Sequence, residues 1–213
     1  MSFNGRRAII SIIATTAVVA VGFSACTSTV SPPSSPPEYT GIAPELTGGK
    51  YAVYETERVF NAPLEPLRAF IEDGNKIVAA MEETDNIKKP VDVVVVSGTW
   101  PQEGSVRRLE FSDGHYTLER VLENDFPTLF RYQVWDFTAA AGNNLDYALG
   151  QQAWQVLPDG RSKLTWTYSL KPNAGYKRFF VQRFVDNDMR PLMDNALDKV
   201  KAEADENFAK ETN

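Results

Sequence analysis

The sequence contains a single histidine, His115, and a single cysteine, Cys26, in 213 residues. A histidine-based metal site needs several imidazole or thiolate ligands brought together, so this composition argues against one. The chain also has neither a Gly-x-Gly-x-x-Gly run nor a phosphate-binding loop, which are the usual fingerprints of nucleotide cofactors. His115 stands beside a turn signal, where a solvent-facing residue is a simpler interpretation than a catalytic one. We therefore expect no metal and no cofactor.

Long clusters of basic residues are absent as well. Lys and Arg number 22 against 28 Asp and Glu, and they group only in short pairs such as Lys88-Lys89 and Arg107-Arg108. Nucleic-acid binding depends on clustered basic side chains that neutralise phosphates, so we exclude nucleic acid as a partner. The same shortage predicts that the folded domain has no basic patch for anionic lipid.

A basic pair, an apolar run and small residues precede Cys26, in the order found in secretion signals. The pair is Arg6-Arg7, and the apolar run covers 8–21. The pattern resembles the lipobox of bacterial lipoproteins, although Phe23 stands where a leucine is usual. This resemblance implies that residues 1–25 are a signal peptide that is removed, and that the thiol of Cys26 carries a diacylglycerol.

An uncleaved transmembrane anchor is the alternative interpretation of this segment. Its apolar run lies at the short edge of the roughly 17–25 residues that span a bilayer, and an anchor does not need small residues before a lone cysteine. Lipidation of Cys26 would leave no thiol for a Cys/His catalytic pair. Thr27 lacks the acidic retention signal that keeps some lipoproteins at the inner membrane, which favours the outer membrane of the bacterial cell envelope. Export by the general secretory route or by the twin-arginine route stays open.

Residues 26–49 are rich in Ser, Pro, Thr and Gly, with a Ser/Pro run at 31–37. This composition favours an extended, polyproline-like tether. At about 3 Å per residue, the tether would hold the domain tens of Å from the bilayer. Loss of the two arginines at positions 6 and 7 leaves 20 basic against 28 acidic residues, a net charge of −8. We therefore expect the membrane to hold this chain through lipid on Cys26, since two or more acyl chains bind stably.

The remaining residues, 50–208, are predicted to form one domain, followed by a short tail at 209–213. Period-two alternation with aromatic and β-branched residues indicates a first strand at 51–60. Two short helices should follow, the first over 63–74 and the second over 75–83.

The second half of the domain alternates apolar strands with turn signals. Six strands are predicted, at 91–97, 105–111, 116–122, 129–137, 145–156 and 163–170. After 172–175 a helical stretch runs to about Phe208, and Pro191 should kink it or begin a new helix. This order of elements indicates an α+β fold in which a curved antiparallel sheet of about seven strands wraps around a long C-terminal helix and leaves a pocket.

Five short motifs follow one another along the domain. They are Phe60-Asn61-Ala62-Pro63-Leu64-Glu65-Pro66-Leu67, Gly104-Ser105-Val106-Arg107-Arg108-Leu109 after Trp100-Pro101, Leu118-Glu119-Arg120-Val121 after Asp113-Gly114, Tyr132, and Leu164-Thr165-Trp166. In this order they resemble the START-like (SRPBCC) superfamily, which has the helix-grip fold and includes polyketide cyclases, plant abscisic-acid receptors, the birch-pollen allergen and lipid-transfer domains. The resemblance covers about residues 50–208, and it rests on the ordered set.

The candidate ligand-binding residues lie first on two neighbouring strands. Period two places Arg107, Leu109 and Phe111 on one face of their strand. The resemblance to the abscisic-acid receptors implies that Arg107 and Glu119 face the cavity. Those receptors use a lysine from the preceding strand, whereas 91–96 offers only valines and one aspartate, so abscisic acid is not implied. An inward Arg107–Glu119 pair suits either a structural bridge or a polar anchor for a ligand.

Aromatic side chains complete the candidate site. They are Tyr132, Tyr147, Trp166, Phe180 and Phe184, of which the resemblance points Tyr147 and Trp166 inward. Core packing explains each of them without a ligand, but in this fold the core lining and the cavity wall are largely the same surface.

Three functions are compatible with these observations. The leading hypothesis is an envelope lipoprotein that binds an apolar or amphipathic small molecule, such as a lipid or a polyketide-like compound. The first alternative is an enzyme of the cyclase or dehydratase type, in which Arg107, Glu119, Tyr132 or Tyr147 assists proton transfer. The second alternative is a structural or partner-binding lipoprotein whose core is filled. The oligomeric state is not predicted.

Overall fold

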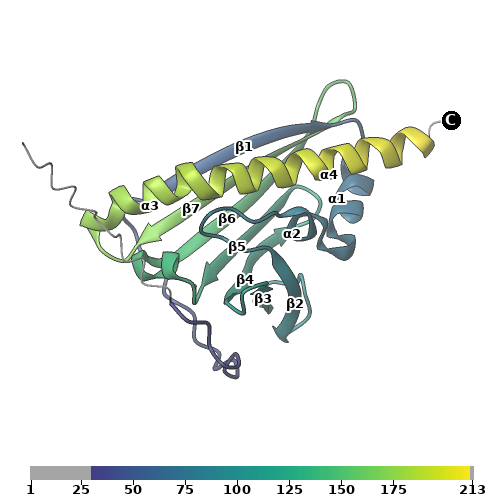
Figure 1. The fold of residues 1–213 in the computed structure, drawn as a ribbon. Coiled ribbons are helices and arrows are strands. Elements are labelled where there is room, and N and C mark those ends of the chain that lie inside the picture. Colours follow the sequence, from purple (N-terminus) through teal and green to yellow (C-terminus); the bar gives the residue numbers. More distant parts are fainter. Residues whose placement is uncertain (1–29, 212–213) are drawn as a thin grey trace, which may run out of the picture.

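The domain is built on one seven-stranded sheet (Figure 1). In the computed structural model, which describes residues 30–211, the strands are β1 (Ala52–Phe60), β2 (Pro90–Ser97), β3 (Val106–Phe111), β4 (Tyr116–Asp125), β5 (Leu129–Trp135), β6 (Leu145–Val156) and β7 (Ser162–Pro172). They lie in the order β1-β7-β6-β5-β4-β3-β2, and every neighbouring pair is antiparallel. Strands β1 and β2 are therefore the two edges of the sheet. The signal peptide and Cys26 lie outside the described residues.

The helices are few and mostly short. They are α1 (Leu64–Glu72), α2 (Lys76–Ala80), α3 (Arg178–Phe184) and α4 (Arg190–Glu211), with 3-10 turns η1 (Asp73–Asn75), η2 (Ala140–Asn144) and η3 (Gly175–Lys177) and a π-helical turn η4 (Val185–Met189). Pro191 is the second residue of α4 and follows directly on the π-helical turn η4, and Val185 and Arg190 at the two junctions both have right-handed helical φ and ψ. Of the kink or new helix expected at Pro191, the structure shows no separate helix: the proline lies beside a π-helical turn within one continuous helical stretch from Arg178 to Glu211. The expected separate tail is wrong for residues 209–211, because α4 continues to Glu211.

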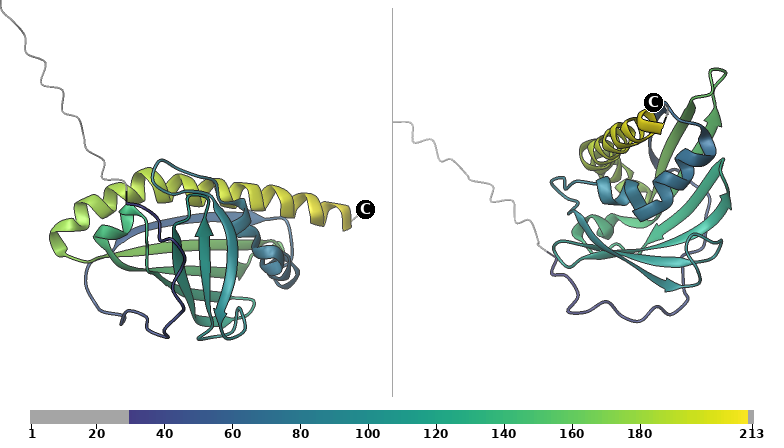
Figure 2. Two further views of the ribbon diagram at one scale, coloured as in Figure 1. Left: turned by 60° about the horizontal axis from the view of Figure 1, so that its bottom comes forward. Right: turned by 90° about the vertical axis from the view of Figure 1, so that its right-hand side faces the viewer.

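The sheet curves around the C-terminal helix, as two further views show (Figure 2). Helix α4 lies along the concave, inner face, and α1 and α2 lie beside its C-terminal part. The expected α+β helix-grip fold, with a curved antiparallel sheet around a long C-terminal helix, is confirmed.

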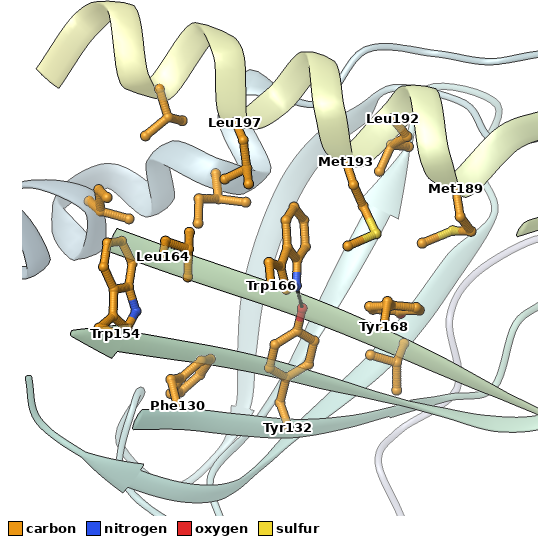
Figure 3. Close-up of a cluster of buried hydrophobic side chains, with 14 of the residues drawn as sticks. Phe130, Tyr132, Trp154, Leu164, Trp166, Tyr168, Met189, Leu192, Met193 and Leu197 are labelled. Atoms are coloured by element: carbon orange, nitrogen blue, oxygen red, sulfur yellow. Dashed lines mark hydrogen bonds between the residues drawn. The ribbon is translucent and has the colours of Figure 1, made fainter. Parts of the chain in front are cut away.

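Strand β7 alternates strictly between buried and half-buried residues, which is the period-two pattern expected of a strand with one face on a core. Its inward side chains lie opposite Met189, Met193 and Leu197 of the C-terminal helix (Figure 3). Trp166 on β7 donates a hydrogen bond from Nε1 to the hydroxyl oxygen of Tyr132 on β5, at 2.9 Å. This bond satisfies two polar groups that would otherwise be buried without partners.

A buried carboxylate attaches the loop between α2 and β2 to the C-terminal helix. Asp188, which is 1% exposed, accepts hydrogen bonds from the Thr84 hydroxyl at 2.8 Å and from both the backbone and side-chain nitrogens of Asn86 at 3.0 and 2.9 Å. Because hydrogen bonds to a charged acceptor are stronger than neutral ones, they hold this loop over the inner face of the sheet.

The segment expected to be a free tether instead packs on the outer, convex face of the sheet. We call residues 30–51 the N-terminal strap. Tyr39 packs on Trp135 with ring centroids 6.4 Å apart, and Gln133 donates from Nε2 to the Pro44 carbonyl at 2.9 Å. The tether expectation is wrong for this part. Aromatic side chains and backbone carbonyls of the strap contact residues of the sheet, and the composition of the strap alone does not predict such long-range contacts.

His115 is also placed differently from the expected turn residue. It is 5% exposed, its Nδ1 lies 3.1 Å from the Thr138 hydroxyl, and its Nε2 lies 3.2 Å from the Val30 carbonyl. The strap therefore covers the histidine that the local turn pattern placed in solvent.

Replacing Gly150 by alanine tests the packing of the inner face. A Cβ built at this position would lie 2.0 Å from the ring of Tyr132, so the ring that bonds Trp166 has to move. We expect Gly150→Ala to lower the free energy of unfolding by about 1–3 kcal/mol in chemical denaturation, as overpacking does. Gly175→Ala is the control, because nothing lies within 4 Å of its Cβ position. Equal stability of the two variants would contradict the described packing.

Candidate functional site

A cavity of about 310 Å³ lies between the inner face of the sheet, the α1–α2 region and the C-terminal helix. Most of its wall is apolar, and the apolar lining includes Ile71, Ile77, Leu109, Phe130, Val134, Leu145, Leu170 and Leu192. Among residues 30–211, no group of three His, Cys, Asp or Glu side chains is placed to hold a metal ion. Nor does this part of the chain contain a helix that is long and apolar enough to cross a bilayer.

Seven of the nine residues predicted to bind a ligand line this cavity. They are Arg107, Leu109 and Phe111 on β3, Glu119 on β4, Tyr132 on β5, Trp166 on β7 and Phe184 on α3. Period two placed Arg107, Leu109 and Phe111 on one face and the family resemblance pointed that face inward, and the structure has these side chains there. Their role in binding a ligand stays a prediction.

The expected inward placement of Tyr147 is wrong. A register irregularity between Leu145 and Tyr147 in the β6–β7 pairing breaks the alternation, so Leu145 lines the cavity whereas Tyr147 belongs to the outer-face cluster. There the Tyr147 hydroxyl lies 2.8 Å from the Tyr51 hydroxyl and accepts a hydrogen bond from the Thr47 backbone nitrogen at 2.8 Å. Tyr147 therefore fastens the N-terminal strap, and it does not contact a ligand in the cavity.

Phe180 is not in the cavity either. It is 57% exposed and packs edge-on against Phe179, with ring centroids 5.7 Å apart. The apolar stripe of the C-terminal helical stretch does include it, but α3 lies at the end of the sheet, beside the ends of β1 and β7 (Figure 1), and the Phe180 side chain stays exposed there. Phe184, one turn later, reaches the cavity.

Arg107 and Glu119 form a buried bridge on the cavity wall. Arg107 donates from Nε and Nη2 to the same carboxylate oxygen of Glu119, at 2.9 and 2.8 Å, and the two side chains are 7% and 4% exposed. Its Nη1 donates to Asn75 Oδ1 at 2.5 Å, and the guanidinium carbon lies 3.8 Å from the ring centroid of Trp100. All three nitrogens of this guanidinium have protein partners, which favours the structural bridge over the ligand anchor.

The pKa directions follow from burial. Desolvation raises the pKa of Glu119, and the Arg107 charge partly opposes that shift. Burial also raises the pKa values of Tyr132 and Tyr168 above their ordinary value, so both phenols are neutral near pH 7.

Several polar groups on the wall are left for a ligand. Within the described part of the chain, the side chains of Thr117, Gln152 and Tyr168 line the cavity without a side-chain hydrogen-bond partner, and Arg68 Nε on the same wall is buried without one. Buried polar groups are normally hydrogen-bonded, so these groups are sites at which a bound molecule or water can be held.

Sequence reasoning missed Arg68, a cation on the apolar face of α1. Arg68 is 1% exposed, lines the cavity and lies between the rings of Phe126 and Trp154, at 5.6 and 5.5 Å from their centroids. Its Nη2 donates to Glu72 at 2.6 Å, and burial lowers its pKa. The available signal was the position of Arg68 four residues after Leu64, within the helical apolar stripe.

Comparison with known families agrees with this architecture. A family described as "Polyketide cyclase / dehydrase and lipid transport" matches residues 52–205, which is most of the chain and the whole of the sheet. The chain belongs to this family. Its START-like character, which five motifs indicated, is therefore confirmed, and the family's description supports hydrophobic ligand binding. No curated protein matches this chain.

Solved structures show the same fold at low sequence identity. The crystal structure of Ara h 8.0201 has a TM-score of 0.52 and 16% identity, covering 71% of this chain and 98% of that one. A protein from Nitrosospira multiformis gives 0.52 and 14%, covering 71% and 95%. The major latex-like protein 151 of Panax ginseng gives 0.52 and 9%, covering 73% and 99%. These similarities are to the fold and leave the ligand open.

A double-mutant cycle on Arg107 and Glu119 tests the bridge. We expect Arg107→Met or Glu119→Leu alone to lower the free energy of unfolding by about 3–5 kcal/mol, because each leaves an unpaired buried charge. The double variant should recover much of this loss. The measurement is chemical denaturation of the four proteins, with the exposed pair Arg161 and Asp159 changed in the same way as a control. Additive effects at positions 107 and 119 would show that the two side chains do not act as a pair.

Proposed function

We propose that this protein is a membrane-anchored envelope lipoprotein that holds an apolar or amphipathic small molecule, such as a lipid or a polyketide-like compound. The observation that carries the proposal is the cavity, because the side chains of the inner face and the C-terminal helix leave about 310 Å³ between them. Small-molecule sites are typically about 300–1,000 Å³, mostly apolar, with few polar groups. The wall described here has that composition.

The polar groups of the wall suit an amphipathic ligand. Arg107 is already occupied by Glu119 and Asn75, so it does not need a ligand to balance its charge. The Tyr168 hydroxyl and Gln152 amide supply neutral donors and acceptors within the apolar surface. A molecule with hydroxyl or carbonyl groups on a larger apolar body would suit this wall.

The alternatives receive less support. A filled core does not fit a cavity of this volume. The family includes cyclases, but Arg107 and Glu119 already pair with each other, and Tyr147 lies on the other face of the sheet. Binding requires only the cavity wall described above. Catalysis requires in addition a side chain that is available for proton transfer.

The membrane part of the proposal rests on the N-terminal sequence. A basic pair, an apolar run and small residues precede Cys26, as in lipoprotein signals. Lipid on this cysteine would anchor the domain in the cell envelope, with outer-membrane delivery favoured by the residue that follows it.

Filling the cavity tests the binding proposal. We expect wild-type protein to bind the fluorescent probe anilinonaphthalene sulfonate, and Leu109→Trp to bind it roughly tenfold more weakly, a change of about 1.4 kcal/mol. Leu109 lines the cavity, so a larger side chain removes space that the probe needs. Val156→Trp is the control, because Val156 is 60% exposed. Fluorescence titration gives the affinities, and thermal unfolding checks that the variants are folded.

Equal probe affinity in Leu109→Trp and wild type would contradict binding in this cavity. Native mass spectrometry of the purified protein provides a second readout, since a copurified apolar compound should be retained by wild type and lost from Leu109→Trp. Chemical conversion of that compound during incubation would instead favour the enzyme.

Metabolic labelling with a fatty-acid analogue tests the anchor. We expect wild-type protein to take up the label and to stay with the membrane fraction after washing. The Cys26→Ser variant should take up none, because the thiol that carries the lipid is gone, whereas Thr27→Ser should behave as wild type. An unlabelled wild-type protein would contradict the lipoprotein assignment.

A further inference from the structure

Three aromatic side chains lie exposed within five residues at the start of the C-terminal helical stretch. Tyr176, Phe179 and Phe180 are 77%, 70% and 57% exposed. The two phenylalanine rings contact each other, and neither belongs to the buried core cluster or packs against it. Apolar residues scattered singly over a surface are ordinary, but a contiguous aromatic patch marks an interaction site.

The same segment is the basic part of an acidic chain. Residues 171–185 contain four basic residues and no acidic one, whereas residues 194–211 of α4 contain six acidic and three basic residues. Lys177, Arg178 and Arg183 surround the exposed aromatics in the sequence. We call residues 175–183 the aromatic-basic tip. Exposed aromatics combined with lysine and arginine are the composition of segments that lie in the interface of an anionic bilayer.

The N-terminal strap begins at the end of the domain that carries this tip. Val30, the first described residue, contacts His115, which also contacts Thr138 just before η2. Within η2, the Asn143 carbonyl accepts a hydrogen bond from Lys177 Nζ at 2.8 Å. The 3-10 turn η2 therefore joins the start of the strap to the tip.

Only three residues separate Cys26 from Val30. Four fully extended peptide units span at most about 14 Å. If Cys26 carries lipid, as the proposed function holds, the anchor keeps this end of the domain next to the bilayer. The strap, being packed on the sheet, does not act as the long spacer that its composition indicated.

The cavity reaches the surface at this end. Of its lining residues, Asn86 and Asp113 are exposed. Asn86 bonds Asp188 of η4, just after α3, and Asp113 bonds the backbone of His115, whose ring contacts Thr138 just before η2. Helix α3 contributes to both the tip and the cavity wall, since Phe184 lines the cavity one turn after the exposed Phe180. A surface that contacts the tip would thus lie beside the opening.

We infer that the aromatic-basic tip docks into the headgroup region of an anionic bilayer and turns the cavity opening toward the lipid. The aromatic rings enter the interface, and the three cations contact anionic headgroups. An apolar molecule can then pass between membrane and cavity without crossing open water. This inference departs from the expectation that the domain has no basic patch for lipid, because Lys177, Arg178 and Arg183 lie within seven residues at one end of the molecule.

Site-specific quenching tests the inference on the lipidated full chain in vesicles. A bromine-quenchable fluorophore is attached at Tyr176→Cys, and at Asp159→Cys in the β6–β7 turn as the matched control. With equal parts phosphatidylglycerol and phosphatidylcholine, brominated lipid should quench the probe at position 176 severalfold more than at 159. The difference should fall in pure phosphatidylcholine and at high salt, since screening weakens surface charge attraction.

A second variant separates docking from anchoring. Phe179→Ser with Phe180→Ser, in the Tyr176→Cys background, should lose the extra quenching while Cys26 stays acylated by mass spectrometry and the melting temperature stays unchanged. Equal quenching at 176 and 159 in acylated protein would overturn the inference and leave the lipoprotein proposal intact. A probe signal at 176 that depends on protein concentration without vesicles would overturn it in favour of contact between copies.

If Cys26 proves unmodified, the lipoprotein proposal fails. The same quenching measurement on the Cys26→Ser chain then tests whether the tip docks on the bilayer without a lipid anchor. Preferential quenching at 176 on anionic vesicles, abolished by the two serine substitutions, would support docking. Absence of that preference would overturn it.

Discussion

The packing of the C-terminal helix against a curved sheet is the constraint on which the rest of the structure depends. Met193, Leu197, Val200 and Ala204 of α4 are completely buried, and each large apolar side chain removed from water contributes about 1.5–3 kcal/mol. A typical domain is stable by only about 5–15 kcal/mol, so this contact is required for folding. Because the sheet curves away from a straight helix, side chains do not fill the whole interval, and the cavity follows from the same geometry.

Charge inside that cavity is balanced locally. The Arg107–Glu119 bridge is closed by Asn75 and covered by Trp100, so it holds β3, β4 and the η1 turn together without needing a ligand. Binding then depends on the apolar wall and on neutral groups such as the Tyr168 hydroxyl. The description of the family includes both enzymes and lipid transport. An apolar wall of this kind can hold a substrate or a transported lipid, so the fold is consistent with either function.

The two ends of the molecule differ in charge and in exposed aromatic residues. One end carries the exposed aromatics of the tip, the start of the strap and the exposed lining residues Asn86 and Asp113. The other carries the acidic C-terminal part of α4. An elongated domain with one basic, aromatic end and one acidic end has a defined orientation beside a negatively charged surface, which is the physical basis of the docking inference.

The sequence by itself determined the elements that depend on local patterns. Alternation placed all seven strands and separated Arg107 from Arg108 onto opposite faces of their strand, and the family resemblance then pointed Arg107 and Glu119 inward. Only the tertiary structure decided the rest. A register irregularity turned Tyr147 outward, the strap covered the outer face, and the end of the sheet left Phe180 exposed. Each of these depends on which distant strand or edge lies opposite a residue, and a local periodicity contains no information about that partner.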